Sequence, residues 1–136
     1  MVYYDSQETS EEDAAATNAI DGKSNTYWHT LWSSGSSKHP HEIQIDLGKS
    51  WTVGGFRYLP IQSQQDGRIK AYEFYVSDST SSWGTAVATG SFTNDAVEKT
   101  VTFTAKSGRY IRIRALSEVN GNPWTSIAEL NVLTSD

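Results

Sequence analysis

Residues able to bind a metal ion or a ligand are concentrated between positions 18 and 30, in the stretch Asn-Ala-Ile-Asp-Gly-Lys-Ser-Asn-Thr-Tyr-Trp-His-Thr. Asp21 and the glycine, serine and asparagine that follow it favour a tight turn, because these residue types tolerate or stabilise turn backbone angles. Such a loop directs carbonyl oxygens inward, and Asp21 adds a carboxylate, so the loop suits a hard cation. His29 leaves the turn beside two aromatic residues, with nitrogens that can bond a ligand. We expect a structural metal site here, with a ligand site beside it.

A second informative stretch runs from Glu118 to Leu130. Its Asn-Gly-Asn-Pro turn places Trp124 on a loop tip, where the indole is either a plug for the end of a β-sandwich or an exposed stacking platform. Glu129 lies among apolar residues at the start of a strand, where a buried carboxylate needs a cation or hydrogen-bond donors. Asp21 has the same need. One calcium ion shared by Asp21 and Glu129 would satisfy both carboxylates.

Recognisable motifs of catalysis are missing from the sequence. The only histidines are His29, His39 and His41, and the His39-Pro40-His41 spacing has no further ligands that the sequence locates. We interpret His39 and His41 as residues of a loop that enters a strand. There is no Gly-x-Ser-x-Gly elbow, no phosphate-binding glycine loop and no cysteine, and the many acids define no particular catalytic pair. The sequence therefore predicts a binding domain rather than an enzyme.

Composition limits the size, partners and compartment of the protein. A chain of 136 residues is about one domain, so we expect a single domain over residues 1–136. The 16 acidic and 11 basic side chains give a net charge of -5, which argues against nucleic-acid binding. No apolar run is long enough for a transmembrane helix. The first residues lack the features of a signal peptide, so the chain is either cytoplasmic or a module of a longer secreted protein.

Alternating apolar and polar residues indicate that strands position these loops. In residues 42–47, Ile43, Ile45 and Leu47 share one face, as in a half-buried strand. Residues 10–16 are expected to form a short helix, capped by Ser10, with acids in its first turn that suit the helix dipole. Many short strands separated by Gly, Ser and Asp turns predict an all-β antiparallel sandwich with this short N-terminal helix. Further strands are expected at residues 2–4, 53–59, 71–76, 99–103, 110–114 and 126–133.

Six short motifs follow one another along nearly the whole chain. They are Ala-Ile-Asp-Gly at 19–22, Trp-His-Thr at 28–30, and the segments 40–48, 67–77, 108–112 and 122–129. In this order they resemble the coagulation factor 5/8 type C (discoidin-like) domains, and more closely the family 32 carbohydrate-binding modules. The resemblance implies a β-sandwich jelly roll with one structural calcium ion and a sugar site on the loops at one end.

For calcium, the resemblance implies ligands from both of the stretches described above. A shell of about six oxygens suits calcium rather than zinc. The implied ligands are the side chains of Asp21, Thr26 and Glu129 and the backbone oxygens of Asn18, Lys23 and Ala128.

For the sugar, galactose-binding members of the family use a histidine, an arginine and an asparagine for the hydroxyls, and aromatic side chains for the apolar ring face. By motif position the histidine is His29, and the aromatic residues are Trp32 and Trp124.

The third region of the expected site departs from this pattern. Ile61 stands where the arginine would be, and isoleucine donates no hydrogen bond. The sugar terminus is therefore galactose-type or a different one, of the glucosamine, mannose or uronate type, and the acidic domain favours neutral or amino sugars. The residues that can supply the missing partner are Gln62, Gln64, Gln65 and Asp66, the last of which lies about where the asparagine would be.

These expectations favour a non-catalytic module that recognises a sugar terminus and targets an attached, secreted bacterial glycoside hydrolase or polysaccharide lyase. The module would be a monomer within a larger enzyme, with no nucleic-acid or membrane partner. The alternative is a discoidin-type adhesion domain that binds a protein or a phospholipid surface through apolar spikes, for which Leu31, Trp32 and Trp124 are available. The neighbouring loops are serine-rich rather than basic, which favours the sugar.

Overall fold

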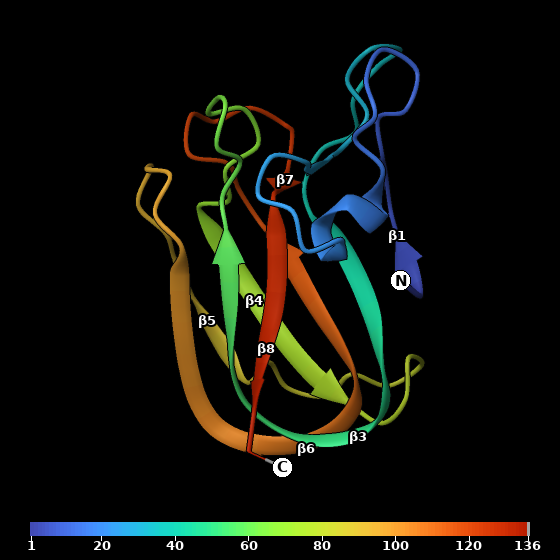
Figure 1. The fold of residues 1–136 in the computed structure, drawn as a ribbon, viewed down its shortest axis with the longest axis vertical. Coiled ribbons are helices and arrows are strands. Elements are labelled where there is room, and N and C mark those ends of the chain that lie inside the picture. Colours follow the sequence, from blue (N-terminus) through green and yellow to red (C-terminus); the bar gives the residue numbers. More distant parts are fainter. Residues whose placement is uncertain (136) are drawn as a thin grey trace.

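The computed structural model describes residues 1–135, and its regular secondary structure is almost entirely antiparallel strands joined by loops (Figure 1). No helix in this part of the chain has the length and apolar character needed to cross a membrane. In chain order the elements are β1 (Tyr3–Tyr4), the 3-10 helix η1 (Ala16–Ile20), β2 (Trp28–His29), β3 (His41–Leu59), β4 (Ala71–Ser77), β5 (Ala88–Ser91), β6 (Lys99–Ala115), β7 (Ser126–Ile127) and β8 (Glu129–Thr134).

The two long strands, β3 and β6, organise the sandwich. They pair along most of their length, with Ile43 opposite Ile113 in one half and Phe56 opposite Val101 in the other. Between the halves both strands bend together at the lower end of Figure 1, and so pass from one layer to the next. The strand order is β1-β3-β6-β4-β5, β8 joins the second half of β3, and β2 pairs separately with β7. The predicted antiparallel sandwich is confirmed.

Alternate residues of these strands fill one hydrophobic core. Ile43 and Ile45 of β3 and Ile113 of β6 are buried there, as their alternation with polar residues predicts. Phe56 stacks on Phe74 with ring centroids 4.2 Å apart. Each such side chain contributes about 1.5–3 kcal/mol when it is fully buried. This core carries the loops at the upper end of Figure 1, where the candidate site lies.

The helix predicted for residues 10–16 is not present, and its placement was wrong. The short helix of this region is η1, a 3-10 helix that begins only at Ala16. The reason is the side chain of Glu8, whose Oε2 accepts the backbone N–H groups of Ser10 at 3.0 Å and Glu11 at 3.1 Å. The N–H of Ala14 donates to the Glu8 carbonyl at 3.0 Å. These bonds fold residues 8–14 into a loop, so Ser10 caps no helix.

Candidate functional site

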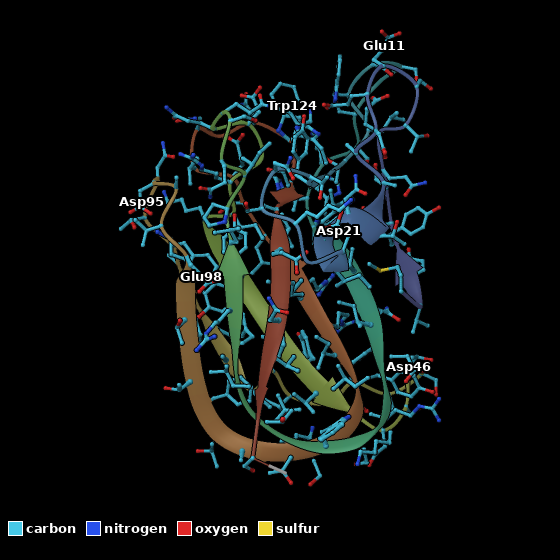
Figure 2. All side chains as sticks on the ribbon, viewed as in Figure 1. Glu11, Asp21, Asp46, Asp95, Glu98 and Trp124 are labelled. Atoms are coloured by element: carbon cyan, nitrogen blue, oxygen red, sulfur yellow. The ribbon has the colours of Figure 1, made fainter. Side chains whose placement is uncertain are left out.

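A cleft of about 270 Å³ opens among the loops at one end of the sandwich. Figure 2 shows Trp124 at this end, far from the bend that carries Asp46. Five of the cleft residues are ones that the sequence predicted for a sugar site, and they come from three separate loops. The sixth, Glu12, was not predicted. The lining side chains are Glu12, His29, Trp32, Gln64, Asp66 and Trp124.

The Trp32 side of the cleft is held by the carboxylate of Glu8, which is fully buried. Glu8 Oε1 accepts the backbone N–H groups of Trp32 at 3.0 Å and Ser33 at 2.8 Å, and Oε2 accepts the Ser33 hydroxyl at 2.9 Å. Burial opposes ionisation, but these donors and the Glu11 N–H outweigh it and lower the pKa of Glu8 to about 2. The ionised carboxylate therefore fixes the loop from which the exposed Trp32 indole projects.

Glu12 joins two aromatic side chains at the edge of the cleft. Trp32 Nε1 donates to its Oε2 at 2.9 Å, and the Tyr27 hydroxyl donates to its Oε1. Burial and the bond to Glu12 raise the pKa of Tyr27 to about 12, so the phenol keeps its proton. Nothing in the local sequence marks Glu12, because it lies among three consecutive acids. Its role depends on two residues that the fold brings to it.

The Trp124 side of the cleft is held by a second buried carboxylate, that of Glu118. Its Oε1 accepts the backbone N–H groups of Asn120 at 2.8 Å and Asn122 at 3.0 Å. Its Oε2 accepts the Gly67 N–H at 2.9 Å and the Asn122 side-chain amide at 3.2 Å. Glu118 thus shapes the turn before Trp124 and ties it to the loop that carries Gln64 and Asp66.

Gly67 brings that loop against the strand that follows Trp124. Its φ is +84°, and a Cβ here would lie 2.6 Å from the backbone nitrogen of Ser126, so no other residue fits. Ser126 donates its N–H to the Gly67 carbonyl at 2.8 Å and its hydroxyl to the Asp66 carbonyl at 2.7 Å. This close contact places Asp66 beside Trp124.

His29 forms the floor of the cleft. It lies on β2, opposite Ser126 of β7, and its ring centroid is 5.9 Å from that of Trp124. Nδ1 lies 2.6 Å from the Thr30 carbonyl oxygen, which can only accept, so Nδ1 carries the proton. Nε2 of the neutral ring is then an acceptor. The side chain is 3% exposed, so a ligand reaches His29 only through the cleft.

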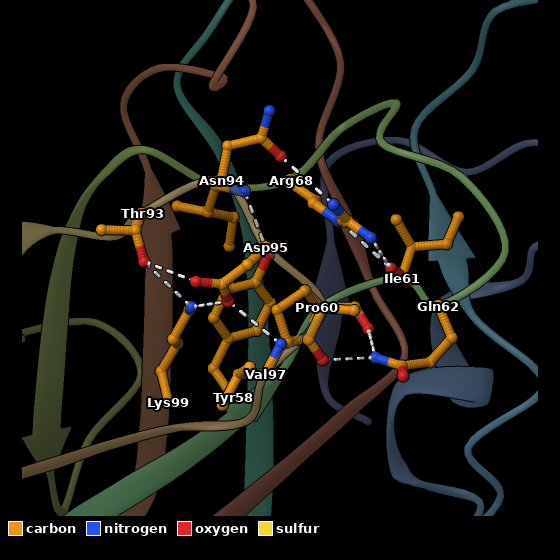
Figure 3. A network of polar contacts seen from close by, with 12 residues as sticks. Tyr58, Pro60, Ile61, Gln62, Arg68, Thr93, Asn94, Asp95, Val97 and Lys99 are labelled. Atoms are coloured by element: carbon orange, nitrogen blue, oxygen red, sulfur yellow. Dashed lines mark hydrogen bonds and ion pairs between the residues drawn. The ribbon is translucent and has the colours of Figure 1, made fainter.

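Among residues 1–135, Ile61 and Gln62 do not belong to the set that lines this cleft. Figure 3 shows the polar contacts that they make instead. Ile61 is fully buried, and its carbonyl accepts Arg68 Nε at 3.2 Å and Nη2 at 2.9 Å. Gln62 donates its side-chain amide to the carbonyls of Pro60 at 2.7 Å and Ala96 at 2.9 Å. The position of the expected arginine is therefore part of the core, and Gln62 faces a neighbouring hollow with Ser24, Asn25, Tyr27 and Ser63.

The predicted cation ligands lie where the first loop meets the start of β8. The Thr26 hydroxyl donates to Asp21 Oδ2 at 2.5 Å, and the Lys23 N–H donates to Oδ1 at 2.9 Å. Glu129 Oε1 accepts the Gly22 N–H at 2.8 Å. Burial and the neighbouring Asp21 carboxylate raise the pKa of Glu129. Two carboxylates that face each other with oxygen donors around them fit a hard cation.

Asn18 and Ala128, whose backbone oxygens are also predicted cation ligands, form hydrogen bonds in the same region. Asn18 donates its side-chain amide to the Tyr27 carbonyl at 3.1 Å, and the N–H of Ala128 donates to the Leu59 carbonyl at 2.9 Å. Neither bond involves the backbone oxygen of Asn18 or of Ala128, which is the atom predicted to bind the cation. Across residues 1–135, no group of three or more His, Cys, Asp or Glu side chains gathers to hold a metal ion.

His39 and His41 lie at the entrance to β3, as predicted. The buried His41 ring has Nδ1 2.7 Å from Asp5 Oδ2 and Nε2 2.6 Å from the Pro123 carbonyl. Burial opposes the charge, but these two acceptors prevail and raise the pKa of His41. His39 bonds the Thr125 hydroxyl at 3.0 Å. The pair therefore anchors the segment around Trp124 and has a structural role.

Comparison with known proteins agrees with this arrangement. Residues 4–130 match the F5/8 type C domain. The chain belongs to this family. Among solved structures, this F5/8 type C domain is similar to a family 32 carbohydrate-binding module of Clostridium perfringens in complex with GalNAc-β-1,3-galactose. The identity is 31%, the TM-score is 0.89, and the match covers 97% of this chain and 93% of the other.

Two more relatives extend the comparison. The family 32 module of NanJ from Clostridium perfringens, in complex with galactose, is 36% identical with a TM-score of 0.83, over 96% of this chain and 90% of the other. A sialidase from Micromonospora viridifaciens is 40% identical over 129 residues, which are 94% of this chain and 20% of the sialidase. This F5/8 type C domain is thus a family 32 carbohydrate-binding module, and it spans about a fifth of the length of that curated relative.

Proposed function

We propose that this domain binds the terminal sugar of a glycan in the cleft and catalyses no reaction on it. The observation that carries the proposal is the cleft itself, in which Trp32 and Trp124 stand beside His29, Gln64 and two carboxylates. A sugar ring has apolar C–H faces and hydroxyl edges, so aromatic side chains with fixed polar partners match it. The Glu8 and Glu118 networks hold these partners in place before a ligand arrives.

The charge of the cleft favours a neutral or amino sugar. Glu12 and Asp66 line it, and no lysine or arginine within residues 1–135 does. A uronate or another anionic sugar would be repelled, whereas hydroxyl and ammonium groups donate to carboxylates. Two similar modules have structures in complex with galactose and with GalNAc-β-1,3-galactose, so a galactose-type terminus is the first candidate. Because Ile61 is buried, Gln64 and Asp66 would supply the bonds expected from an arginine and an asparagine.

Calcium is the cation that the first loop would hold. The side chains of Asp21, Thr26 and Glu129 supply oxygens, and Asn18, Lys23 and Ala128 supply backbone carbonyls. An all-oxygen set of this kind suits calcium. The ion would neutralise the two facing carboxylates and connect the first loop to β8. Its role would be structural, and it would not contact the sugar.

The wider protein is part of the proposal. The sialidase relative is about five times longer than the matched segment, and it acts on glycans according to its name. We place this domain as a monomeric module within a larger secreted enzyme that degrades glycans. A single sugar end binds weakly, and attachment raises the effective concentration of the catalytic domain at its substrate.

A glycan array followed by calorimetric titration tests the sugar site. Trp124→Ala should weaken binding of the best glycan at least tenfold, because an aromatic face contributes about 1.5–3 kcal/mol when covered. Tyr4→Ala is the control, because Tyr4 is an exposed aromatic residue on β1 that does not line the cleft. Its exposed fraction, 41%, is close to the 40% of Trp32 in the cleft. Absence of glycan binding together with binding to anionic vesicles would replace this proposal by the adhesion alternative.

A further inference from the structure

A second hollow lies next to the cleft. Its volume is about 320 Å³, comparable with the 270 Å³ of the cleft itself. It lies between the predicted cation loop and the loop that follows β3. The residues that line it are Ser24, Asn25, Tyr27, Gln62 and Ser63.

Tyr27 forms the boundary between the two spaces. Its ring lines the second hollow, and its hydroxyl donates to Glu12, which lines the cleft. Ser63 of the hollow precedes Gln64 of the cleft directly. The two hollows are therefore neighbours, with Tyr27 and the loop of Ser63 and Gln64 between them.

The lining of the second hollow is polar and carries no formal charge. Within residues 1–135, the side chains of Ser24, Asn25 and Ser63 form no hydrogen bonds with the protein. Gln62 donates its side-chain amide to the carbonyls of Pro60 and Ala96, and its Oε1 remains as an acceptor (Figure 3). Hydroxyls, amides and one aromatic face are the groups that an uncharged sugar matches.

We infer that this hollow is a second subsite, which takes the next, uncharged sugar residue of a glycan whose terminal residue occupies the cleft. The inference rests on the proposed function of the cleft. It gives Gln62 a role in the second subsite, where the sequence pattern alone had grouped it with the first. The preferred ligand is then at least a disaccharide, and the linkage must direct the second ring over Tyr27.

Titration with matched sugars tests this subsite. The probes are methyl galactoside, methyl N-acetylgalactosaminide and a panel of disaccharides with the same terminal residues and different linkages. At least one disaccharide should bind three- to tenfold more tightly than its methyl glycoside, as one or two additional hydrogen bonds provide. In NMR spectra, the side-chain amides of Asn25 and Gln62 should shift with that disaccharide and stay unchanged with the methyl glycoside.

Variants separate the two subsites. Asn25→Ala should reduce disaccharide affinity to that of the methyl glycoside and leave the methyl glycoside unaffected, whereas Asn131→Ala, at an exposed position of β8, should change neither. If every disaccharide binds no better than its methyl glycoside, the second subsite is wrong and the cleft stands. If no sugar of either kind binds, the proposed function fails and the subsite fails with it.

Discussion

The cleft and the predicted cation loop are both built around carboxylates, but the carboxylates meet different partners. In the cleft, Glu8 accepts N–H and hydroxyl groups from Trp32 and Ser33. Glu118 accepts N–H groups from the remote Gly67 and from the turn that follows Glu118 itself. In the cation loop, Asp21 and Glu129 face each other, and Glu129 has a raised pKa. The protein alone therefore satisfies the first arrangement, whereas the proposed calcium ion would neutralise the carboxylates of the second.

The largest expected effect comes from removing Glu118. Glu118→Ala should lower the free energy of unfolding by about 3–5 kcal/mol, because three backbone N–H groups and a side-chain amide lose their buried carboxyl acceptor. Thermal unfolding measures the loss, and sugar affinity should fall with it. Glu98→Ala, at an exposed position on the side of the sandwich in Figure 2, is the matched control and should change the melting temperature little. A small effect of Glu118→Ala would show that the Trp124 loop does not depend on this carboxylate.

Removing calcium should have the next largest effect. With the ion at about one hundred times its dissociation constant, binding stabilises the folded state by about 2.7 kcal/mol, so a chelator should lower the melting temperature by about 10 °C. The variant Glu129→Gln should abolish this response and cost little in chelator, in contrast to Glu118→Ala. A melting temperature that changes with neither chelator nor added calcium would contradict the cation site. The cation loop and the cleft would then not differ in their need for a cation.

The features that could be predicted from the sequence are those that neighbouring residues determine. His29, Trp32 and Trp124 lie in short motifs with turn residues, and the fold brings them to one cleft. The alternation around Ile43 marked the core face because its period of two is a local property.

The rest depends on contacts between distant segments. Glycine and serine around Gly48 and Gly108 indicated breaks between strands, yet β3 and β6 continue through them because the two strands bend as a pair. Glu8 and Glu118 read as ordinary surface acids, since their donors lie up to 51 residues away. The helix at residues 10–16 failed for a local reason instead, because the Glu8 carboxylate accepts the backbone N–H groups of Ser10 and Glu11.

Acid titration should show a smaller change in stability, which comes from Glu8 on the Trp32 side of the cleft. The folded pKa of Glu8, about 2, is below its usual value of 4.5. A depressed carboxyl pKa contributes stability that is present above pH 4.5 and is lost as the pH falls toward 2. The melting temperature of the wild-type domain should therefore fall by several degrees between pH 5 and pH 2. Glu8→Gln should be less stable at neutral pH and lose less across this range. Parallel curves for the two proteins would contradict an ionised Glu8.

The smallest expected effect concerns His41, a titratable side chain that helps to hold the Trp124 segment described above. Both ring nitrogens face acceptors, Asp5 and the Pro123 carbonyl, so the charged ring is the bonded form and its pKa is above 6.5. A raised histidine pKa contributes stability that is complete below pH 6.5 and lost as the pH rises through the folded value. The neutral ring can donate to only one acceptor, so the bond to Pro123 or to Asp5 weakens.

We therefore expect the melting temperature to fall by a few degrees from about pH 6 to pH 9, and sugar affinity to fall by about twofold as Trp124 loosens. NMR titration of the His41 ring locates the transition, and His41→Gln should remove it. His39, whose pKa is lowered by burial and by the neighbouring His41, titrates at lower pH than His41. A flat profile in the wild-type protein would mean that Glu118 alone, without His41, sets the position of Trp124.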